Sequence, residues 1–162
     1  RKESFDLQEL IDETVRYMNP ELKYPPIEVV TAFAQRDVTL HSDAQLLQQV
    51  LVNLLSNAVH AVREAHTKEG GMIELRVNLS GEIVHISVID NGPGIDQSKL
   101  DNIFDFFYTT KPPGQGTGLG LPICKKIIHS LGGALSVESR PGKGATFTIA
   151  LPGHQSHLSD QA

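Results

Sequence analysis

The sequence predicts an α+β fold, a two-layer α/β sandwich in which helices cover one face of a mixed, mostly antiparallel sheet. An apolar stripe at helical spacing runs through residues 42–66. Apolar and polar residues alternate over residues 73–79, which is the pattern of a half-buried strand. Two further strand patterns flank a Pro-Gly turn at residues 141–142. Strands and helices in this arrangement fit two packed layers.

The first half of the chain is expected to form a helix, two strands and a long second helix. The helix is predicted at residues 5–18 and ends at Asn19-Pro20, and the strands at residues 27–33 and 38–40. The long helix, at residues 42–66, opens on Ser42-Asp43-Ala44-Gln45, which has the form of a capping box.

The second half is expected to add strands and two shorter helices. Strands are predicted at residues 73–79, 83–89, 134–139 and 145–151, and helices at residues 96–104 and 119–131. Residues 1–152 are read as one domain, and residues 153–162 as a polar, disordered tail.

Charge and composition exclude several classes of function. The net charge of −5 provides no basic field for nucleic acid or an anionic membrane. No apolar run approaches the ~20 residues that span a bilayer. Cys124 is the only cysteine, which rules out an internal disulfide and favours a cytoplasmic setting. The chain begins with Arg1 rather than Met, so we expect a longer parent protein, which could itself be membrane-bound.

Polar side chains follow one face of the long predicted helix. Asn53, Asn57, His60 and Glu64 recur at helical spacing within an otherwise apolar stretch. An ordinary solvated face is one interpretation. The other is a ligand site, because a carboxamide oxygen is a suitable neutral ligand for Mg²⁺ that keeps waters and phosphate oxygens around it.

Two glycine-rich segments could approach a nucleotide. Asp90-Asn91-Gly92-Pro93-Gly94 ends a predicted strand, and it is either a tight turn or a place where a carboxylate meets a purine amino group. Gly116-Thr117-Gly118-Leu119-Gly120-Leu121 runs into a helix, where free amides can bind phosphates. It is not a Walker loop, because no Gly-Lys-Ser/Thr follows.

The order of these segments resembles the ATP-binding domain of two-component sensor histidine kinases, which have the Bergerat fold. Residues 53–58 resemble the N box of that family, and residues 90–94 its first glycine box. Residues 103–111 resemble the F box and residues 116–121 the second glycine box, while residues 139–147 resemble the closing hairpin. The resemblance covers nearly the whole chain, from Phe5 to Pro152.

The resemblance implies Mg²⁺-dependent ATP binding. Asp90 would accept a hydrogen bond from the adenine amino group, both directly and through a water molecule, beside Gly92 and Gly94. Thr146 would lie near that water. Asn57 would bind Mg²⁺, and Asn53 and His60 would support the phosphates. The segment between the glycine boxes would close as a lid carrying Lys111 toward the γ-phosphate. Backbone amides along the triphosphate would come from the second glycine box, namely Gly116, Thr117, Gly118, Leu119, Gly120 and Leu121.

Three positions depart from the family pattern. His60 stands where lysine is common, and Phe106 where proline is usual. Asn53 occupies the place of the acidic residue that activates water in ATP-hydrolysing relatives, and an amide cannot act as a base. The resemblance therefore implies slow hydrolysis and transfer of the γ-phosphate to a protein histidine.

The implied acceptor histidine lies on a dimerisation domain outside this chain, because none of the seven histidines is followed by Asp or Glu. A response regulator would be the next partner, and the isolated domain would be a monomer. The alternatives are an ATP-driven conformational clamp, a degenerate nucleotide-binding module, and a serine kinase that shares the same boxes.

Overall fold

Five strands form one mixed sheet in the order β2-β4-β5-β7-β6. The computed structural model describes residues 1–23, 25–35, 37–65, 70–105 and 120–153. β2 (Ile27–Phe33) runs parallel to β4 (Gly71–Ser80). The other neighbours are antiparallel, and they comprise β5 (Ile83–Asp90), β6 (Ala134–Ser139) and β7 (Ala145–Pro152). The predicted mixed, mostly antiparallel sheet is confirmed.

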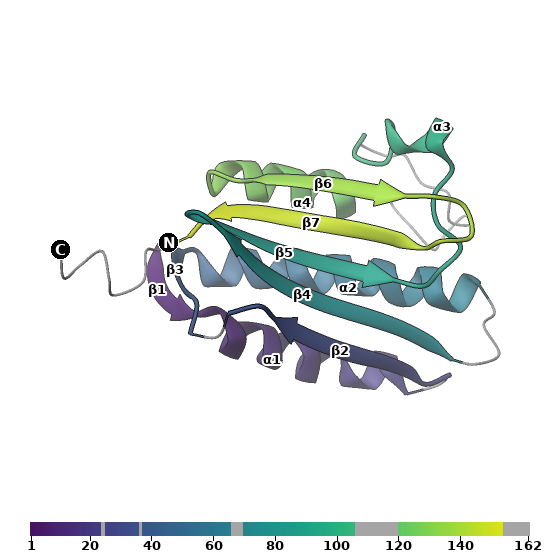
Figure 1. Ribbon diagram of the computed structural model, residues 1–162, viewed down its shortest axis with the longest axis horizontal. Coiled ribbons are helices and arrows are strands. Elements are labelled where there is room, and N and C mark those ends of the chain that lie inside the picture. Colours follow the sequence, from purple (N-terminus) through teal and green to yellow (C-terminus); the bar gives the residue numbers. More distant parts are fainter. Residues whose placement is uncertain (24, 36, 66–69, 106–119, 154–162) are drawn as a thin grey trace.

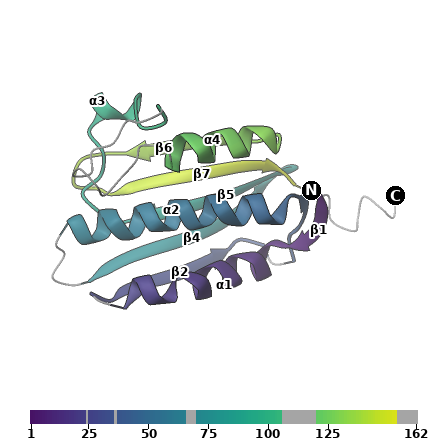
Figure 2. The ribbon, with the colours of Figure 1, turned by 180° about the vertical axis from the view of Figure 1, so that it is seen from behind.

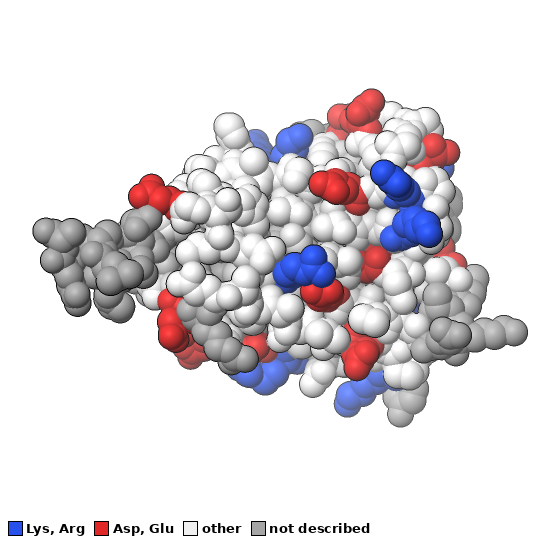
Figure 3. All heavy atoms as spheres, viewed as in Figure 1, with Lys and Arg blue, Asp and Glu red and all other residues white. Residues whose placement is uncertain are grey.

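Three helices cover one face of this sheet. α2 (Ala44–Glu64) lies in the middle, between α1 (Leu7–Met18) and α4 (Gly120–Ser130), as Figures 1 and 2 show from opposite sides. The other face bears few charged side chains, and these are scattered (Figure 3). No helix in the described part of the chain is long and apolar enough to cross a membrane.

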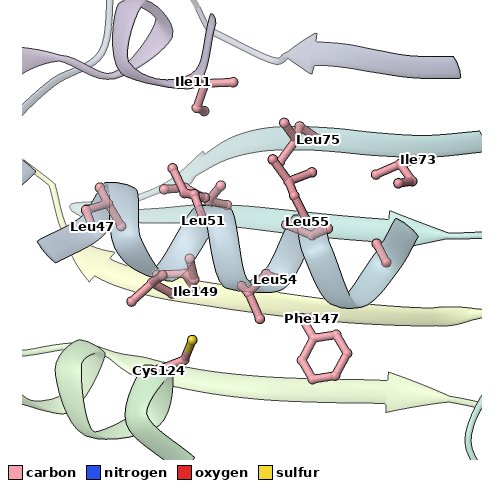
Figure 4. Packing of buried hydrophobic residues seen from close by; sticks show 14 of the residues in the cluster. Ile11, Leu47, Leu51, Leu54, Leu55, Ile73, Leu75, Cys124, Phe147 and Ile149 are labelled. Carbon is pink, nitrogen blue, oxygen red and sulfur yellow. The ribbon is translucent and has the colours of Figure 1, made fainter. Parts of the chain in front are cut away.

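The core lies between α2 and the sheet. Leu47, Leu51, Leu54 and Leu55 of α2 are all at most 2% exposed, and they point toward strand residues such as Ile149 (Figure 4). Burying one such side chain stabilises the fold by about 1.5–3 kcal/mol. The apolar stripe therefore fixes which side of α2 faces the sheet, and with it the position of the polar residues on the same helix.

The N-terminal helix starts later than predicted. Phe5 belongs to a strand, β1 (Glu3–Asp6), and pairs with Leu40 of β3 (Thr39–Ser42). α1 then begins at Leu7, because the Asp6 carboxylate accepts hydrogen bonds from the Gln8 and Glu9 backbone N–H groups at 2.9 and 3.3 Å. A 3₁₀ helix, η1 (Asn19–Leu22), follows α1 where the helical pattern was predicted to break.

The predicted capping box at Ser42 is wrong. Ser42 is the last residue of β3, and the helix is capped by Asp43, whose carboxylate accepts a hydrogen bond from the Leu46 N–H at 3.0 Å. The helix predicted over residues 96–104 is also shorter, because α3 (Gln97–Leu100) gives way to turns before Ile103 is buried.

Candidate functional site

Asp90 is a buried carboxylate at the end of β5. It is 6% exposed, and its Oδ1 accepts hydrogen bonds from the Gly92 N–H at 2.8 Å and the Ala145 N–H at 3.3 Å. Burial raises the pKa of Asp90, and these two hydrogen bonds oppose that rise. Both bonds end on the same oxygen, so Oδ2 is the atom able to accept a hydrogen bond from a ligand.

Asp90 lies in a row of side chains across the end of the sheet. The row runs from Ile73 through Asp90 and Ala145 to Ser139, each paired with the next. Its members face the helices, because every second residue of β5 and β7 on that side is buried.

The predicted placement of Thr146 beside Asp90 is therefore not supported. Thr146 pairs with Ile89, one step out of the row. Successive side chains of a strand point to opposite faces, so Thr146 lies on the face away from the helices. The residue next to Asp90 on β7 is Ala145, which contributes its backbone N–H and a methyl group.

Glycines let the segment after Asp90 approach α2 and the β6–β7 turn. A Cβ on Gly92 would come within 2.9 Å of the Ala61 backbone on α2. Gly94 has φ of +80°, and a Cβ there would lie 2.1 Å from the carbonyl oxygen of Arg140. Real Cβ atoms do not come this close to backbone, so both positions need glycine.

The polar residues of α2 lie beside this segment. Asn53 makes a side-chain hydrogen bond with Cys124 of α4, while Ala61, eight residues further along α2, meets Gly92. Asn57 lies between these two contacts on the same side of the helix. Asn53, Asn57 and His60 are all partly buried, and by their helical spacing they share one side of α2.

Cys124 itself is not a reactive group. It is fully buried, and burial raises the pKa of its thiol to about 11, although the hydrogen bond with Asn53 opposes the rise. A thiol with so high a pKa stays protonated at neutral pH and behaves as a small apolar side chain.

α4 begins at Gly120, and Leu121 packs at the edge of the core. Phe104 lies edge-on to Phe147 with ring centroids 6.3 Å apart, and the Lys125 ammonium sits 4.7 Å above the Phe104 ring. Phe104 therefore packs onto the body of the domain. The remaining predicted residues, Lys111, Gly116, Thr117, Gly118 and Leu119, lie outside the described residues.

The described residues contain no group of three or more His, Cys, Asp or Glu side chains that could hold a metal ion. Mg²⁺ does not need such a cluster, because it commonly binds through one or two protein oxygens, several waters and the phosphates of a substrate. The carboxamide oxygen of Asn57 is a donor of the right kind.

Sequence reasoning missed two residues that contact the site. Ser139 and Ala145 were assigned only to a closing hairpin, and neither residue type suggests a role at Asp90. Ala145 could have been found by counting the register back from the predicted hairpin turn. The contacts of Ser139 involve backbone atoms of two loops, and no sequence pattern marks them.

A match to the family of histidine kinase-, DNA gyrase B- and HSP90-like ATPases covers residues 42–155. Among curated proteins, the C4-dicarboxylate transport sensor protein DctS of Rhodobacter capsulatus is 34% identical over 149 residues, which are 92% of this chain and 22% of DctS. The sensor histidine kinase ZraS of Escherichia coli is 36% identical over 93% of this chain and 31% of ZraS. The chain thus spans less than a third of these relatives.

Solved structures show the same similarity. The catalytic domain of the histidine kinase ThkA superposes with a TM-score of 0.82 at 33% identity, covering 94% of this chain and 95% of that domain. Full-length ShkA in complex with AMPPNP has a TM-score of 0.83 at 29% identity, covering 96% of this chain and 32% of ShkA. ThkA in complex with the response regulator protein TrrA has a TM-score of 0.80 at 30% identity, over 94% of this chain and 42% of that one.

Proposed function

The chain belongs to the family of histidine kinase-, DNA gyrase B- and HSP90-like ATPases, and we propose that it acts as the ATP-binding half of a sensor protein-histidine kinase. The observation that carries this proposal is the buried Asp90, with Oδ1 occupied by two backbone amides and Oδ2 outside both bonds. Its relatives DctS and ZraS are sensor proteins, and ThkA is a histidine kinase.

Asp90 selects the base. Its carboxylate accepts the hydrogen bond of the adenine amino group, whereas guanine presents a carbonyl oxygen at the same place. Two acceptors facing each other in a buried site cost about 1–3 kcal/mol, which corresponds to roughly 10- to 100-fold weaker binding. Gly92 and Gly94 allow the backbone to pass close to the flat ring.

The polar face of α2 serves the phosphate side of the site. When Mg²⁺ is bound, Asn57 would hold it through its carboxamide oxygen, and Asn53 and His60 would contact the phosphates or the waters of the metal. Lys111 and the backbone amides of residues 116–121 complete the phosphate contacts. When bound, ATP supplies the transferable γ-phosphoryl group. Since Asn53 cannot deprotonate water, that group is kept for a protein acceptor.

The acceptor domain is assigned from the resemblance of the sequence to sensor histidine kinases, and the response regulator also from a solved complex. The acceptor histidine lies on a dimerisation domain of the parent protein, and a response regulator receives the phosphoryl group next. ThkA is seen in complex with the response regulator protein TrrA, and this supports the second assignment. We place the kinase domain at residues 1–152 and its site of action in the cytoplasm.

Binding of ATP by the purified chain tests the assignment of Asp90. Titration calorimetry with magnesium and ATP should give saturable binding, and Asp90→Asn should abolish it, because the amide presents a donor to the adenine amino group. Asp96→Asn is the matched control, since Asp96 is an exposed carboxylate that caps α3 by accepting from the Ser98 N–H at 3.1 Å. Unchanged ATP affinity in Asp90→Asn would refute the assignment.

A further inference from the structure

Ser139, the last residue of β6, joins two loops that meet beside Asp90. Its hydroxyl accepts a hydrogen bond from the Ile95 backbone N–H at 2.7 Å and donates one to the Gly144 carbonyl oxygen at 2.7 Å. Ile95 belongs to the segment between β5 and α3, and Gly144 to the turn between β6 and β7. A single hydroxyl group therefore bridges the two segments.

The two amides that hold Asp90 lie in, or directly after, the bridged segments. Gly92, in the same segment as Ile95, donates to Oδ1 at 2.8 Å. Ala145, which directly follows Gly144, donates to the same oxygen at 3.3 Å. The bridge through Ser139 therefore contributes to the relative position of these two donors, together with the pairing of Ala145 with Asp90 and Ser139 in the sheet.

The two segments are packed backbone against backbone, so a shift in one is transmitted to the other. Gly144 has φ of +77°, and a Cβ there would lie 2.0 Å from the Asp90 carbonyl oxygen. The Gly142 N–H donates to the Pro93 carbonyl oxygen at 2.6 Å. Gln97 adds a hydrogen bond from its Nε2 to the Ser139 carbonyl oxygen at 2.6 Å.

Removing the Ser139 hydroxyl would leave the Ile95 N–H and the Gly144 carbonyl without this partner. Ser139 is only partly buried, so water can enter in its place. Water restores hydrogen bonds but does not restore a fixed distance between the two segments. The Gly142–Pro93 hydrogen bond still joins the segments, but the donors on Asp90 lose the support of the hydroxyl, and the Asp90 carboxylate is held less firmly in one orientation.

We propose that Ser139 is a positioning residue for base selection, acting through Gly92 and Ala145 to fix the Asp90 carboxylate with Oδ2 presented to the nucleotide. The proposal rests on the proposed function, because it assumes that Asp90 receives the adenine amino group. Ser139 itself does not contact the base. Its effect falls on the preference for ATP over GTP, and only secondarily on the stability of the fold.

Competition binding measures this preference directly. The purified chain is loaded with trinitrophenyl-ATP in the presence of magnesium, and ATP and GTP are used to displace it. Ser139→Ala should bind ATP about 10-fold more weakly, which is the upper end of what the loss of one hydrogen bond contributes. GTP affinity should change less, because GTP gains no hydrogen bond from Asp90, so the ATP-to-GTP ratio of affinities should fall by a similar factor.

Two further variants separate positioning from general weakening. Ser87→Ala removes a hydroxyl that lies 3.0 Å from the Thr148 hydroxyl on the opposite face of the same sheet, and it should leave the ratio unchanged. Ser139→Thr keeps the hydroxyl and should retain most of the wild-type ratio. If Ser139→Ala does not fold, Ser139→Cys takes its place, because a thiol is a weaker hydrogen-bonding group, and the ratio should fall; an unchanged ratio in folded Ser139→Cys would overturn the role of Ser139.

The possible outcomes distinguish the two proposals. A wild-type chain that binds no ATP overturns the proposed function and this proposal with it. A wild-type chain that prefers ATP, together with a folded Ser139→Ala whose ratio is unchanged, overturns the role of Ser139 alone. Equal weakening of ATP and GTP, or a folded Ser139→Thr that loses the preference, also overturns it.

Discussion

Asp90 meets two opposing demands at the scale of a single residue. In the proposed role, burial of its carboxylate excludes water from the base, yet burial also penalises its charged form and raises its pKa. The amides of Gly92 and Ala145 offset part of that penalty. The residue that we assign to nucleotide binding should therefore lower the stability of the fold at neutral pH.

The stability of the Asp90→Asn variant tests whether the buried charge of Asp90 destabilises the fold. An amide has no charge to desolvate, and its oxygen can still accept from both backbone N–H groups, so at pH 7 the nucleotide-free variant should unfold at a higher denaturant concentration than the wild-type chain. Because the pKa of Asp90 is higher in the folded state than in the unfolded state, Asp90 stabilises the fold at pH values below its unfolded-state pKa. This stabilisation is lost as the pH rises through the folded-state pKa. The advantage of the variant should accordingly shrink as pH falls toward 3.8, the ordinary value for aspartate. A variant less stable than wild type at pH 7 would contradict the argument.

At the scale of secondary-structure elements, the contact between α2 and the segment after β5 sets the geometry of the proposed site. α2 supplies Asn53 and Asn57 on one side and packs its apolar stripe against the sheet on the other. Ala61 brings the same helix against Gly92. The distance between the base-binding and phosphate-binding halves of the proposed site is thus fixed by this one close approach.

Substituting Gly92 should disturb that approach. In Gly92→Ala the new Cβ would meet the Ala61 backbone at 2.9 Å, which forces the segment away from α2. Overpacking of this kind typically costs about 1–3 kcal/mol of unfolding free energy, measurable by urea titration. Gly120→Ala is the stability control, because no atom of the described residues lies within 4 Å of a Cβ at the start of α4. It should change the unfolding free energy by less than about 1 kcal/mol, and equal losses in both variants would refute the explanation by crowding.

Local sequence patterns predicted a strand or helix well where residues within it and directly beside it mark both of its ends. Strands β2 and β6 have the predicted bounds, since alternation and the flanking turns mark both ends. β1 was missed because Phe5 also fits the helical spacing, and only pairing with Leu40 makes it a strand residue. Thr146 was placed at Asp90 by resemblance, whereas the register selects Ala145. Contacts that depend on register or on two loops, such as those of Ser139, could not be read from the sequence.

At the scale of the whole molecule, the chain corresponds to only a part of its longer relatives. It spans 22% of DctS and 31% of ZraS, so most of each relative lies outside the similarity. In the proposed function Asp90 binds the base and the polar face of α2 meets the phosphates, while the Asn53 amide cannot act as a base for hydrolysis. The proposed chemistry therefore needs a second domain to accept the phosphoryl group.

Phosphoryl transfer should occur only when that second domain is present. With radiolabelled ATP and magnesium, the chain alone should stay unlabelled and release phosphate slowly, because neither an acceptor nor a base is available. Adding the histidine-bearing domain of the parent protein should label that domain with phosphate that is lost in acid, since phosphohistidine is acid-labile. Asn57→Ala should remove most of this transfer by weakening the hold on Mg²⁺, while Ser87→Ala, on the opposite face of the sheet, should not. Acid-stable label would indicate a serine kinase, and rapid hydrolysis without an acceptor would indicate a conformational clamp, so either result would reject the proposed transfer to histidine.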